Sequence, residues 1–309
     1  MNKFIKAGIA GLFLSLTATL ASCGGSSTSS TDTAAVTADV YPVTVGDLTL
    51  EAQPTSIISL SPTATEMLYA IGAGDQVVAV DEYSNYPAEA VALGTKLSGF
   101  EPNIEAISSY SPDLVIVSYD PGSLVEQLST LNIPVFIAGA AMSLENVYEQ
   151  IEQLGVLTGH SQAAIEVSQT LQAGIEEAVA SVQFSEPPLS YYYELDNTYY
   201  SVTSNTFIGQ IFNLFGMRNI ADNVEAGNDY PQLSAEVIVS SDPDFIFLAD
   251  TKCCAQDATT VAARDGWGGL KAVTANQVVE LDDDISSRWG PRVLDLITAI
   301  RDAVVAANS

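Results

Sequence analysis

Two adjacent cysteines, Cys253 and Cys254, carry the most reactive side chains of the sequence. A thioredoxin-type redox pair needs two residues between its cysteines, and this pair has none. A structural zinc ion takes four Cys or His ligands, whereas the chain after Cys23 offers these two cysteines and His160. We therefore expect a structural role: either a vicinal disulfide that makes a rigid turn, or two reduced, buried thiols.

The other reactive residues form no common catalytic motif. His160 is the single histidine, and no G-x-S-x-G elbow is present to supply a serine nucleophile. Its Gly-His-Ser context predicts an exposed loop histidine followed by Ser161 as a helix N-cap. Asp282 to Asp284 could bind a hard cation, but they lack the spacing of an EF-hand, and no nucleotide-binding glycine motif occurs. We expect no catalytic residue, no resident metal and no cofactor.

The balance of charge excludes nucleic acid as a partner. The sequence has 38 Asp and Glu against 10 Lys and Arg, which gives a formal net charge of −28. Binding to nucleic acid requires clustered lysine and arginine, because these side chains neutralise the phosphates. The same acidity disfavours an anionic ligand and favours a neutral or cationic one.

The amino-terminal segment has the pattern of a lipoprotein signal peptide, residues 1–22. Lys3 and Lys6 precede an apolar run that is too short, and too rich in Ser and Thr, for a membrane-spanning helix. The motif LASC resembles a bacterial lipobox, so we expect lipidation of Cys23 and an extracytoplasmic protein anchored to the cell membrane. A plain signal peptide cut nearby is the alternative. Residues 23–40, rich in Ser, Thr and Gly, predict a flexible tether.

Hydrophobic patterning in residues 54–158 predicts an α/β lobe. A strand at 57–60 is followed by a helix with Ser61 as its cap, and the apolar run VVAV is the next strand. A second unit follows, in which Asn103 caps a helix, Ser111-Pro112-Asp113 ends it, and LVIV is a strand. Strands without polar alternation, joined by helices, are typical of a parallel sheet covered on both faces.

The same order of signals returns in residues 187–309. The stretch YSVTSNTFIGQIFNLFGMRNIAD predicts a strand, a polar cap and a helix, and Asp242-Pro243-Asp244 corresponds to the earlier Ser-Pro-Asp stop. Between the two halves, residues 159–184 have apolar positions at near-helical spacing without proline. We therefore predict two similar α/β lobes with mainly parallel sheets, joined by one long helix, with the ligand cleft between the lobes at the strand ends.

Three motifs in this order resemble a known family. They are PTSIISLSPTATEMLYAIGAGDQVVAVDEYSNYP, LSGFEPNIEAISSYSPDLVIVS and SSRWGPRVLDLI. They are similar to the class III substrate-binding proteins of bacterial ABC importers, the Fe/B12 periplasmic-binding-domain family, from about Pro54 to the C-terminus. The resemblance implies two α/β lobes, a long joining helix, no catalysis, a metal-chelate ligand (a corrinoid or a ferric siderophore) and an ABC permease as partner.

The vitamin B12-binding members imply ligand contacts on this chain. Their aromatic positions fall on Tyr83, Phe100, Tyr119 and Tyr230, and an acidic and a basic contact fall on Asp284 and Arg288. Flat aromatic walls suit a large planar or chelated ligand. Trp289 is either one more wall or a packing residue that anchors the last helix.

The resemblance also implies two glutamates that dock into basic pockets of the permease. Glu66 matches the first of these by its motif, and Glu236 matches the second by its motif and by the lobe repeat. The alternative is that both are ordinary first-turn carboxylates favoured by the helix dipole. Two further functions stay open on the same fold: a secreted enzyme that uses the cysteine pair, and a surface protein that binds a cation at Asp282 to Asp284.

Overall fold

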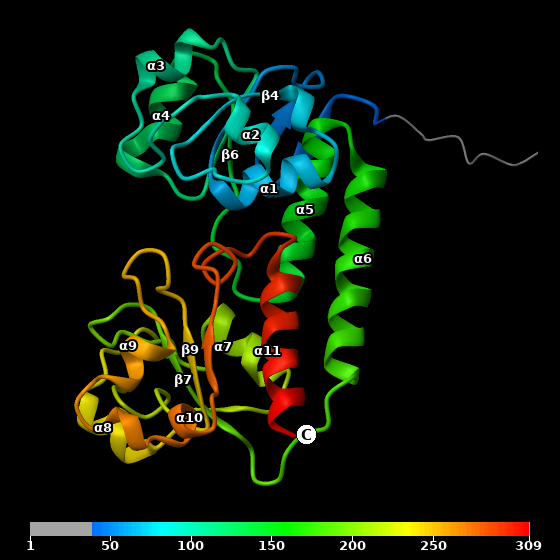
Figure 1. Ribbon diagram of the computed structural model, residues 1–309. Helices are drawn as coiled ribbons and strands as arrows, with labels where there is room; N and C mark the ends of the chain where they lie inside the picture. Colours follow the sequence, from blue (N-terminus) through cyan, green and yellow to red (C-terminus); the bar gives the residue numbers. More distant parts are fainter. Residues whose placement is uncertain (1–38, 309) are drawn as a thin grey trace, which may run out of the picture. The chain divides into compact units, whose positions relative to one another are not determined.

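The computed structural model describes residues 39–308 (Figure 1). The predicted signal peptide, Cys23 and nearly all of the predicted tether lie outside the described residues. Within 39–308, no helix combines the length and the hydropathy that a membrane span needs.

The first lobe is built on a four-stranded parallel sheet with the order β4-β3-β5-β6. Its strands are β3 (Ile57–Leu60), β4 (Val77–Val80), β5 (Leu114–Val117) and β6 (Val135–Ile137). Its helices are α1 (Pro62–Ala70), α2 (Ala88–Ala92), α3 (Ile104–Ser109) and α4 (Leu124–Ser129), with short 3₁₀ turns at Gly74–Gln76 and Pro121–Ser123. Ser61 caps α1 and Asn103 caps α3, as the sequence predicts.

The second lobe repeats this topology with the order β10-β9-β7-β8. Its strands are β7 (Ser190–Glu194), β8 (Arg218–Asn219), β9 (Phe245–Leu248) and β10 (Val278–Glu280). Its helices are α7 (Phe207–Asn213), α8 (Ala235–Ser241), α9 (Ala258–Ala262) and α10 (Lys271–Thr274), with a 3₁₀ turn at Trp267–Gly269. In both lobes the first strand lies between the second and the third, and the fourth lies beyond the third. The predicted α/β fold with two similar lobes is confirmed.

The repeat extends to individual side chains at the start of each central strand. Asp113 Oδ2 accepts from the backbone N–H groups of Thr55 and Ser56 at 2.8 and 3.1 Å. Asp244 Oδ2 accepts from the backbone N–H and the hydroxyl of Ser190 at 2.8 and 2.7 Å. Each aspartate thereby joins the start of the third strand of its lobe to the start of the first strand. The hydrogen bond from the Thr55 N–H also holds the pKa of Asp113 below its ordinary value.

One predicted strand was misplaced. The first strand of the second lobe is β7, in the tyrosine stretch that was expected to pack in a strand, whereas the start of YSVTSNTFIGQIFNLFGMRNIAD, predicted as the first strand, forms none. Tyr191, Tyr192 and Tyr193 on β7 are fully buried, and Tyr191 stacks on Phe212 with the ring centroids 4.1 Å apart. Consecutive tyrosines do not have the aliphatic pattern expected of a central strand, but their large apolar rings fill both faces of the sheet.

Three long helices run beside one another next to the lobes (Figure 1). They are α5 (Leu144–Thr158), α6 (Ser161–Ala180) and α11 (Val293–Ala307), and α6 packs against both others. A Cβ on Gly155 would lie 2.4 Å from the Cβ of Ala164, so glycine is required where α5 and α6 touch. The single long helix predicted at residues 159–184 corresponds to α6, which begins two residues later and ends four residues earlier than predicted.

The start of α6 also differs from the prediction. His160 is the N-cap residue and makes no side-chain cap bond, while Ser161 is the first helical residue. Asp39 Oδ2 accepts from the Ser161 N–H at 3.1 Å and supplies the cap from a distant part of the chain. His160 is half-buried rather than exposed, and its Nδ1 lies 2.9 Å from the Thr158 carbonyl oxygen.

A hairpin precedes the first lobe. Strands β1 (Val43–Val45) and β2 (Leu48–Leu50) are antiparallel, and β1 packs on α5. The Tyr41 hydroxyl donates to the Leu157 carbonyl at 3.0 Å, so ordered structure extends upstream of the predicted lobe boundary at residue 54.

Candidate ligand-binding site

Three of the predicted ligand contacts meet at the carboxyl edge of the first sheet. Tyr83 follows β4, Tyr119 follows β5, and Phe100 lies on the connection between α2 and α3. The ring centroids of Tyr83 and Phe100 are 5.7 Å apart in an edge-to-face arrangement, and those of Phe100 and Tyr119 are 6.5 Å apart. We call these three residues the aromatic triad. Their exposed fractions of 53%, 63% and 44% leave an apolar surface uncovered, which is typical of a ligand-binding surface.

Beneath the aromatic triad lies a cavity of 80 Å³. Besides the triad residues Tyr83, Phe100 and Tyr119, its lining consists of Leu60, Pro62, Asp81, Gly99 and Ser118. The strand ends of one parallel sheet thus supply both flat apolar walls and polar groups, the combination expected of a small-molecule site.

Tyr230, the fourth predicted aromatic contact, belongs to the second lobe. It lies on the connection between β8 and α8, is 57% exposed, and its N–H donates to Asn228 Oδ1 at 2.9 Å. No ring contact joins Tyr230 to the aromatic triad within residues 39–308. The structure therefore groups the three residues of the first lobe and leaves Tyr230 as a separate exposed ring.

Glu66, predicted to dock onto a permease, is buried in an ion-pair cluster instead. Its Oε1 accepts from Arg288 Nη1 at 2.7 Å and from Arg292 Nη2 at 2.5 Å, and its Oε2 accepts from Arg292 Nε at 2.9 Å. We call Glu66, Arg288 and Arg292 the Glu66 clasp, because it fastens α1 to the segment that precedes α11. Glu66 is 3% exposed, so its carboxylate cannot enter a pocket of another protein in this conformation.

Arg288, predicted as a basic ligand contact, uses its terminal nitrogens within the protein. Nη1 donates to Glu66 and to Asn85 Oδ1, and Nη2 donates to the Tyr83 carbonyl oxygen at 3.0 Å and to Asp284 Oδ1 at 2.8 Å. These bonds account for all four N–H groups of the two terminal nitrogens. Arg288 therefore does not point to the ligand but fixes the backbone of Tyr83 in the aromatic triad.

Asp284, predicted as an acidic ligand contact, also bonds to other side chains of the protein through both of its carboxylate oxygens. Its Oδ2 lies 2.7 Å from Lys252 Nζ and 3.1 Å from Asn85 Nδ2, while Oδ1 pairs with Arg288. Burial opposes ionisation, but the hydrogen bond from Lys252 and the charge of Arg288 outweigh it and hold the pKa of Asp284 below its ordinary value. Both predicted polar ligand contacts thus belong to the network that supports the site.

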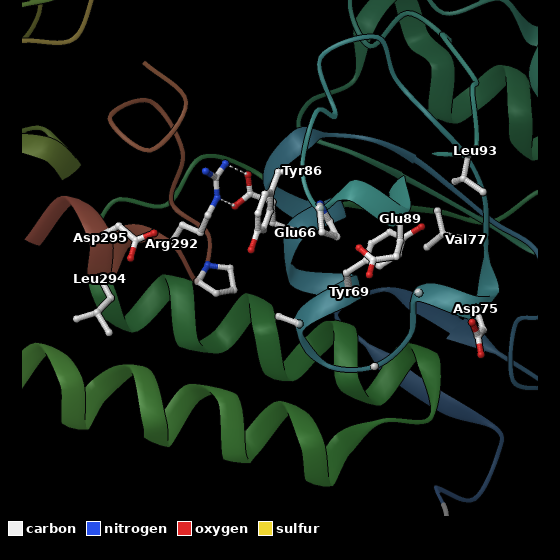
Figure 2. Close-up of a pocket in the computed structure, with 15 residues that line it drawn as sticks. Glu66, Tyr69, Asp75, Val77, Tyr86, Glu89, Leu93, Arg292, Leu294 and Asp295 are labelled. Atoms are coloured by element: carbon white, nitrogen blue, oxygen red, sulfur yellow. Dashed lines mark hydrogen bonds and ion pairs between the residues drawn. The ribbon is translucent and has the colours of Figure 1, made fainter. Parts of the chain in front are cut away.

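Arg292 completes the clasp on the outer side. Its guanidinium carbon lies 4.3 Å from the centre of the Tyr86 ring, and hydrogen bonding to Glu66 raises the pKa of Arg292. Figure 2 shows Arg292 reaching Glu66 beside this ring. The ion pair forms one wall of an 810 Å³ hollow whose exposed rim carries Asp75, Glu89 and Asp295.

This larger hollow is a weaker candidate for ligand binding than the aromatic triad. The charges of Glu66 and Arg292 on its wall satisfy each other, and the three rim carboxylates are solvated. The triad, in contrast, presents apolar rings that nothing in the described chain covers.

Trp289 packs against the hydrophobic core and does not line the cavity beneath the aromatic triad. It is half-buried against the main hydrophobic core, and its indole N–H donates to Gln150 Oε1 on α5 at 3.2 Å. Of its two predicted roles, the structure supports the anchoring of the last helix.

The cysteine pair is present as two free thiols, with the Sγ atoms 2.8 Å apart. The predicted vicinal disulfide is therefore not formed in the structure, and the alternative of two buried thiols is wrong about burial, because Cys253 is exposed and Cys254 is half-buried. The turn is held by Asp283 instead, whose carboxylate accepts from the N–H groups of Lys252 and Cys253 at 3.0 and 2.8 Å. Burial and the neighbouring Cys254 raise the pKa of Cys253 to about 12, so this thiol is a poor nucleophile at neutral pH.

The three consecutive aspartates do not form a cation site. Asp282 pairs with Lys252 Nζ at 2.7 Å, and Asp283 and Asp284 are engaged as described above. Within residues 39–308, no group of three or more His, Cys, Asp or Glu side chains is arranged to hold a metal ion.

Sequence reasoning missed a buried acidic cluster at the carboxyl edge of the second sheet. Glu194 ends β7 and forms a two-pronged ion pair with Arg264, with both N–O distances 2.6 Å. Asp250, two residues after β9, is fully buried, and neither carboxylate oxygen has a hydrogen-bond partner. Burial and the negative charge of Glu194 raise the pKa of Asp250 to about 7. The only sequence signal was an aspartate directly after a buried strand.

Glu236, the second predicted docking residue, is exposed in the first turn of α8. In the lobe repeat, α8 corresponds to α3, because each helix leads into the third strand of its lobe. Glu236 follows the cap Ser234 by two positions, and Glu105 follows the cap Asn103 by two positions and is also exposed. The fold therefore pairs Glu236 with Glu105, whereas the motif paired it with Glu66.

Comparison with known proteins agrees with the two-lobed architecture. The model of the family described as periplasmic binding protein matches residues 57–285. An uncharacterized ABC transporter substrate-binding lipoprotein of Bacillus subtilis, YvrC, is 29% identical and is covered over 97% of both chains. A cobalamin-binding protein of Halobacterium salinarum is 31% identical over 85% of this chain and 74% of its own length.

Among solved structures, the periplasmic vitamin B12-binding protein BtuF of Vibrio cholerae superposes with a TM-score of 0.69. It is 28% identical, and the match covers 83% of this chain and 98% of that one. The family match over most of the chain and these relatives show that the chain belongs to the periplasmic binding protein family of the Fe/B12 type, the non-enzymatic substrate-binding proteins of ABC importers.

Proposed function

We propose that this substrate-binding protein captures a metal chelate on the aromatic triad and delivers it to an ABC permease, and that the chelate is a neutral corrinoid. The observation that carries the proposal is the group of three exposed rings at the strand ends of the first sheet. Tyr230 supplies a ring from the second lobe.

Charge and relatives both favour the corrinoid over an anionic siderophore. The two arginines of the Glu66 clasp, Arg288 and Arg292, are already paired with carboxylates, so neither guanidinium is free to meet an anion. Formal net charge of −28 adds a repulsive field. Relatives named cobalamin-binding and vitamin B12-binding protein, at 31% and 28% identity, support the same class. A ferric siderophore remains the second ligand class, restricted to neutral or cationic chelates.

We expect Phe100→Ala to weaken cyanocobalamin binding about 10- to 100-fold, because burying one large ring contributes about 1.5–3 kcal/mol. Phe100 is the central ring, in contact with both Tyr83 and Tyr119. Isothermal titration calorimetry of the domain that starts at residue 39 measures the change in Kd.

The matched control is Tyr110→Ala, which removes an exposed ring of the same lobe outside the triad. It should leave the Kd unchanged. Equal affinities of wild type and Phe100→Ala would contradict binding on the triad, and wild-type binding of a cationic ferric hydroxamate in place of cyanocobalamin would transfer the ligand assignment to that class.

For delivery, we propose that Glu105 and Glu236 dock onto the permease. Both are exposed, and the lobe repeat places them at the same position of corresponding helices. A symmetric pair of carboxylates, one on each lobe, suits two equivalent basic pockets on the permease.

The double variant Glu105→Ala, Glu236→Ala is expected to lower permease-dependent uptake in proteoliposomes more than about 10-fold, because two charge-assisted contacts are lost. Its affinity for cyanocobalamin should stay that of the wild type, since neither residue belongs to the triad. Glu126→Ala, which removes an exposed carboxylate from α4, is the control. Unchanged uptake by the double variant would remove these two residues from the docking surface.

For localisation, we propose that Cys23 carries the lipid that anchors the protein outside the cytoplasm. The support is the LASC motif after an apolar run and the lipoprotein named among the relatives.

A further inference from the structure

The cavity beneath the aromatic triad contains one carboxylate with no counter-ion. Asp81 follows β4 directly, lines the 80 Å³ cavity, and is 4% exposed. Its Oδ1 is buried and has no hydrogen-bond partner. A buried carboxylate in this state is costly, so such groups are normally paired.

The neighbouring donors leave Oδ1 without a partner, and among them only Ser84 hydrogen-bonds to the Asp81 carboxylate. Thr65 donates to Ser59 and shares a 2.9 Å hydrogen bond with Ser84, so these hydroxyls bond to one another. The charge of Arg288 acts on Asp81, but its four terminal N–H groups already donate to Glu66, Asn85, Asp284 and the Tyr83 carbonyl oxygen. No ion pair to Asp81 forms anywhere between residues 39 and 308.

The backbone around Asp81 leaves no room for a replacement partner from the protein. A Cβ on Gly99 would lie 3.2 Å from Asp81 Oδ2 and 2.9 Å from the Leu60 carbonyl oxygen. Any larger residue at this position would therefore push against the carboxylate. Burial raises the pKa of Asp81 despite hydrogen bonding from Ser84 and the charge of Arg288, as expected for a carboxylate that lacks a strong donor.

We propose that Asp81 is the polar specificity residue of the site: it accepts a hydrogen bond from an amide or ammonium N–H of the chelate seated on the aromatic triad, and it repels chelates that present a carboxylate there. The inference rests on the proposed function and narrows it. An uncharged corrinoid bears peripheral amides that can supply the missing donor. A ligand whose periphery is anionic would place a second carboxylate beside the buried Asp81, where like charges repel more strongly than they do in water.

The test compares two probes on three variants by calorimetry. The probes are cyanocobalamin and its monocarboxylic acids, in which one peripheral amide is hydrolysed to a carboxylate. The variants are Asp81→Ala, Asp81→Asn and, as control, Glu82→Gln, which removes a charge from the exposed neighbouring residue.

Asp81→Ala should weaken cyanocobalamin binding about 10- to 100-fold, because a charge-assisted hydrogen bond is lost. Asp81→Asn keeps an acceptor oxygen and the side-chain shape, so it should lose less affinity. At least one of the monocarboxylic acids should bind the wild type about 10-fold more weakly than cyanocobalamin, and Asp81→Asn should abolish that preference. Glu82→Gln should behave as wild type with both probes.

The outcomes separate this inference from the function on which it rests. Wild-type affinity and unchanged preference in both Asp81 variants, alongside weakened binding by Phe100→Ala, would overturn the role of Asp81 and leave binding on the triad intact. Failure of the wild type to bind cyanocobalamin or a ferric hydroxamate would instead overturn the proposed function, and this inference with it. Asp81→Asn preserves the side-chain volume, so we expect this variant to fold. Thermal unfolding of the wild type and each variant, measured in parallel, checks that the compared proteins are folded.

Discussion

Replacing Glu66 with alanine is expected to lower the free energy of unfolding by about 3–5 kcal/mol, which is the cost of removing one partner from a buried ion pair. The change leaves two guanidinium groups, of Arg288 and Arg292, without the carboxylate that both contact. Arg288 is 8% exposed and cannot recover its hydration without disturbing Tyr83 and Asp284, to which it also donates. Urea unfolding followed by circular dichroism measures the loss.

The control for the loss of a negative charge is Glu89→Ala, because Glu89 is an exposed carboxylate on the rim of the same hollow. This variant should change the free energy of unfolding by less than about 0.5 kcal/mol. The Glu66→Gln variant preserves shape but removes the charge and should fall between wild type and Glu66→Ala. A Glu66→Ala protein with wild-type stability but without uptake would refute the structural role and restore Glu66 as a docking residue.

The clasp shows which part of the molecule the sequence could not predict. Glu66 and Arg288 are separated by 222 positions in the chain, and no local pattern indicates that they meet. The motif alone identified Glu66, Asp284 and Arg288 as functional, yet side-chain direction and burial decide whether such a residue faces solvent, a ligand or another side chain. Here all three side chains bond to other parts of the protein. Glu66 and Asp284 hold Arg288, which in turn donates to the backbone of Tyr83 in the aromatic triad.

Local signals predicted the framework well, because a parallel α/β lobe is built from short segments with distinct patterns. The caps Ser61 and Asn103 were predicted at the correct residues, and the two x-Pro-Asp stops occupy equivalent positions in the lobes. The same alignment of the stops pairs Glu105 with Glu236, because each glutamate lies six positions before its stop. The residues of the aromatic triad were named only through the resemblance to vitamin B12-binding proteins, and the structure brings them together at one edge of the first sheet.

The carboxylates left without a partner lay beyond sequence reasoning for a different reason. Asp81 and Asp250 each follow a buried strand, a position that in most chains would be a solvated turn. Both carboxylates have oxygens without a hydrogen-bond partner, and the absence of a partner depends on the packing of the whole lobe. Asp81 lines a cavity, whereas Asp250 is enclosed completely beside the Glu194–Arg264 pair.

This enclosure makes Asp250 a source of pH-dependent stability, which Asp250→Asn is expected to remove. The pKa of Asp250 is about 7 in the folded protein because of burial and the charge of Glu194, against 3.8 as the ordinary value. The folded state therefore binds more protons than the unfolded state between about pH 4 and pH 7, and the contribution of this group to stability falls as pH rises through that range.

Above pH 7 the folded wild type holds a second buried negative charge beside Glu194, and the neutral amide of Asp250→Asn avoids it while its N–H can donate to the Glu194 carboxylate. The variant should exceed the wild type in free energy of unfolding by about 2–4 kcal/mol at pH 8, at 1.36 kcal/mol for each unit of pKa shift. At pH 5, where the folded wild type already holds the proton on Asp250, the difference should fall to about 1–2 kcal/mol, because the unfolded chain ionises with a pKa of 3.8. Urea unfolding at four pH values between 5 and 8 measures it, with the exposed Asp265→Asn as the control that should show no such trend. A variant less stable than wild type at pH 8 would mean that the Asp250 oxygens are compensated after all, and a gap independent of pH would mean that the amide improves packing rather than removing a charge.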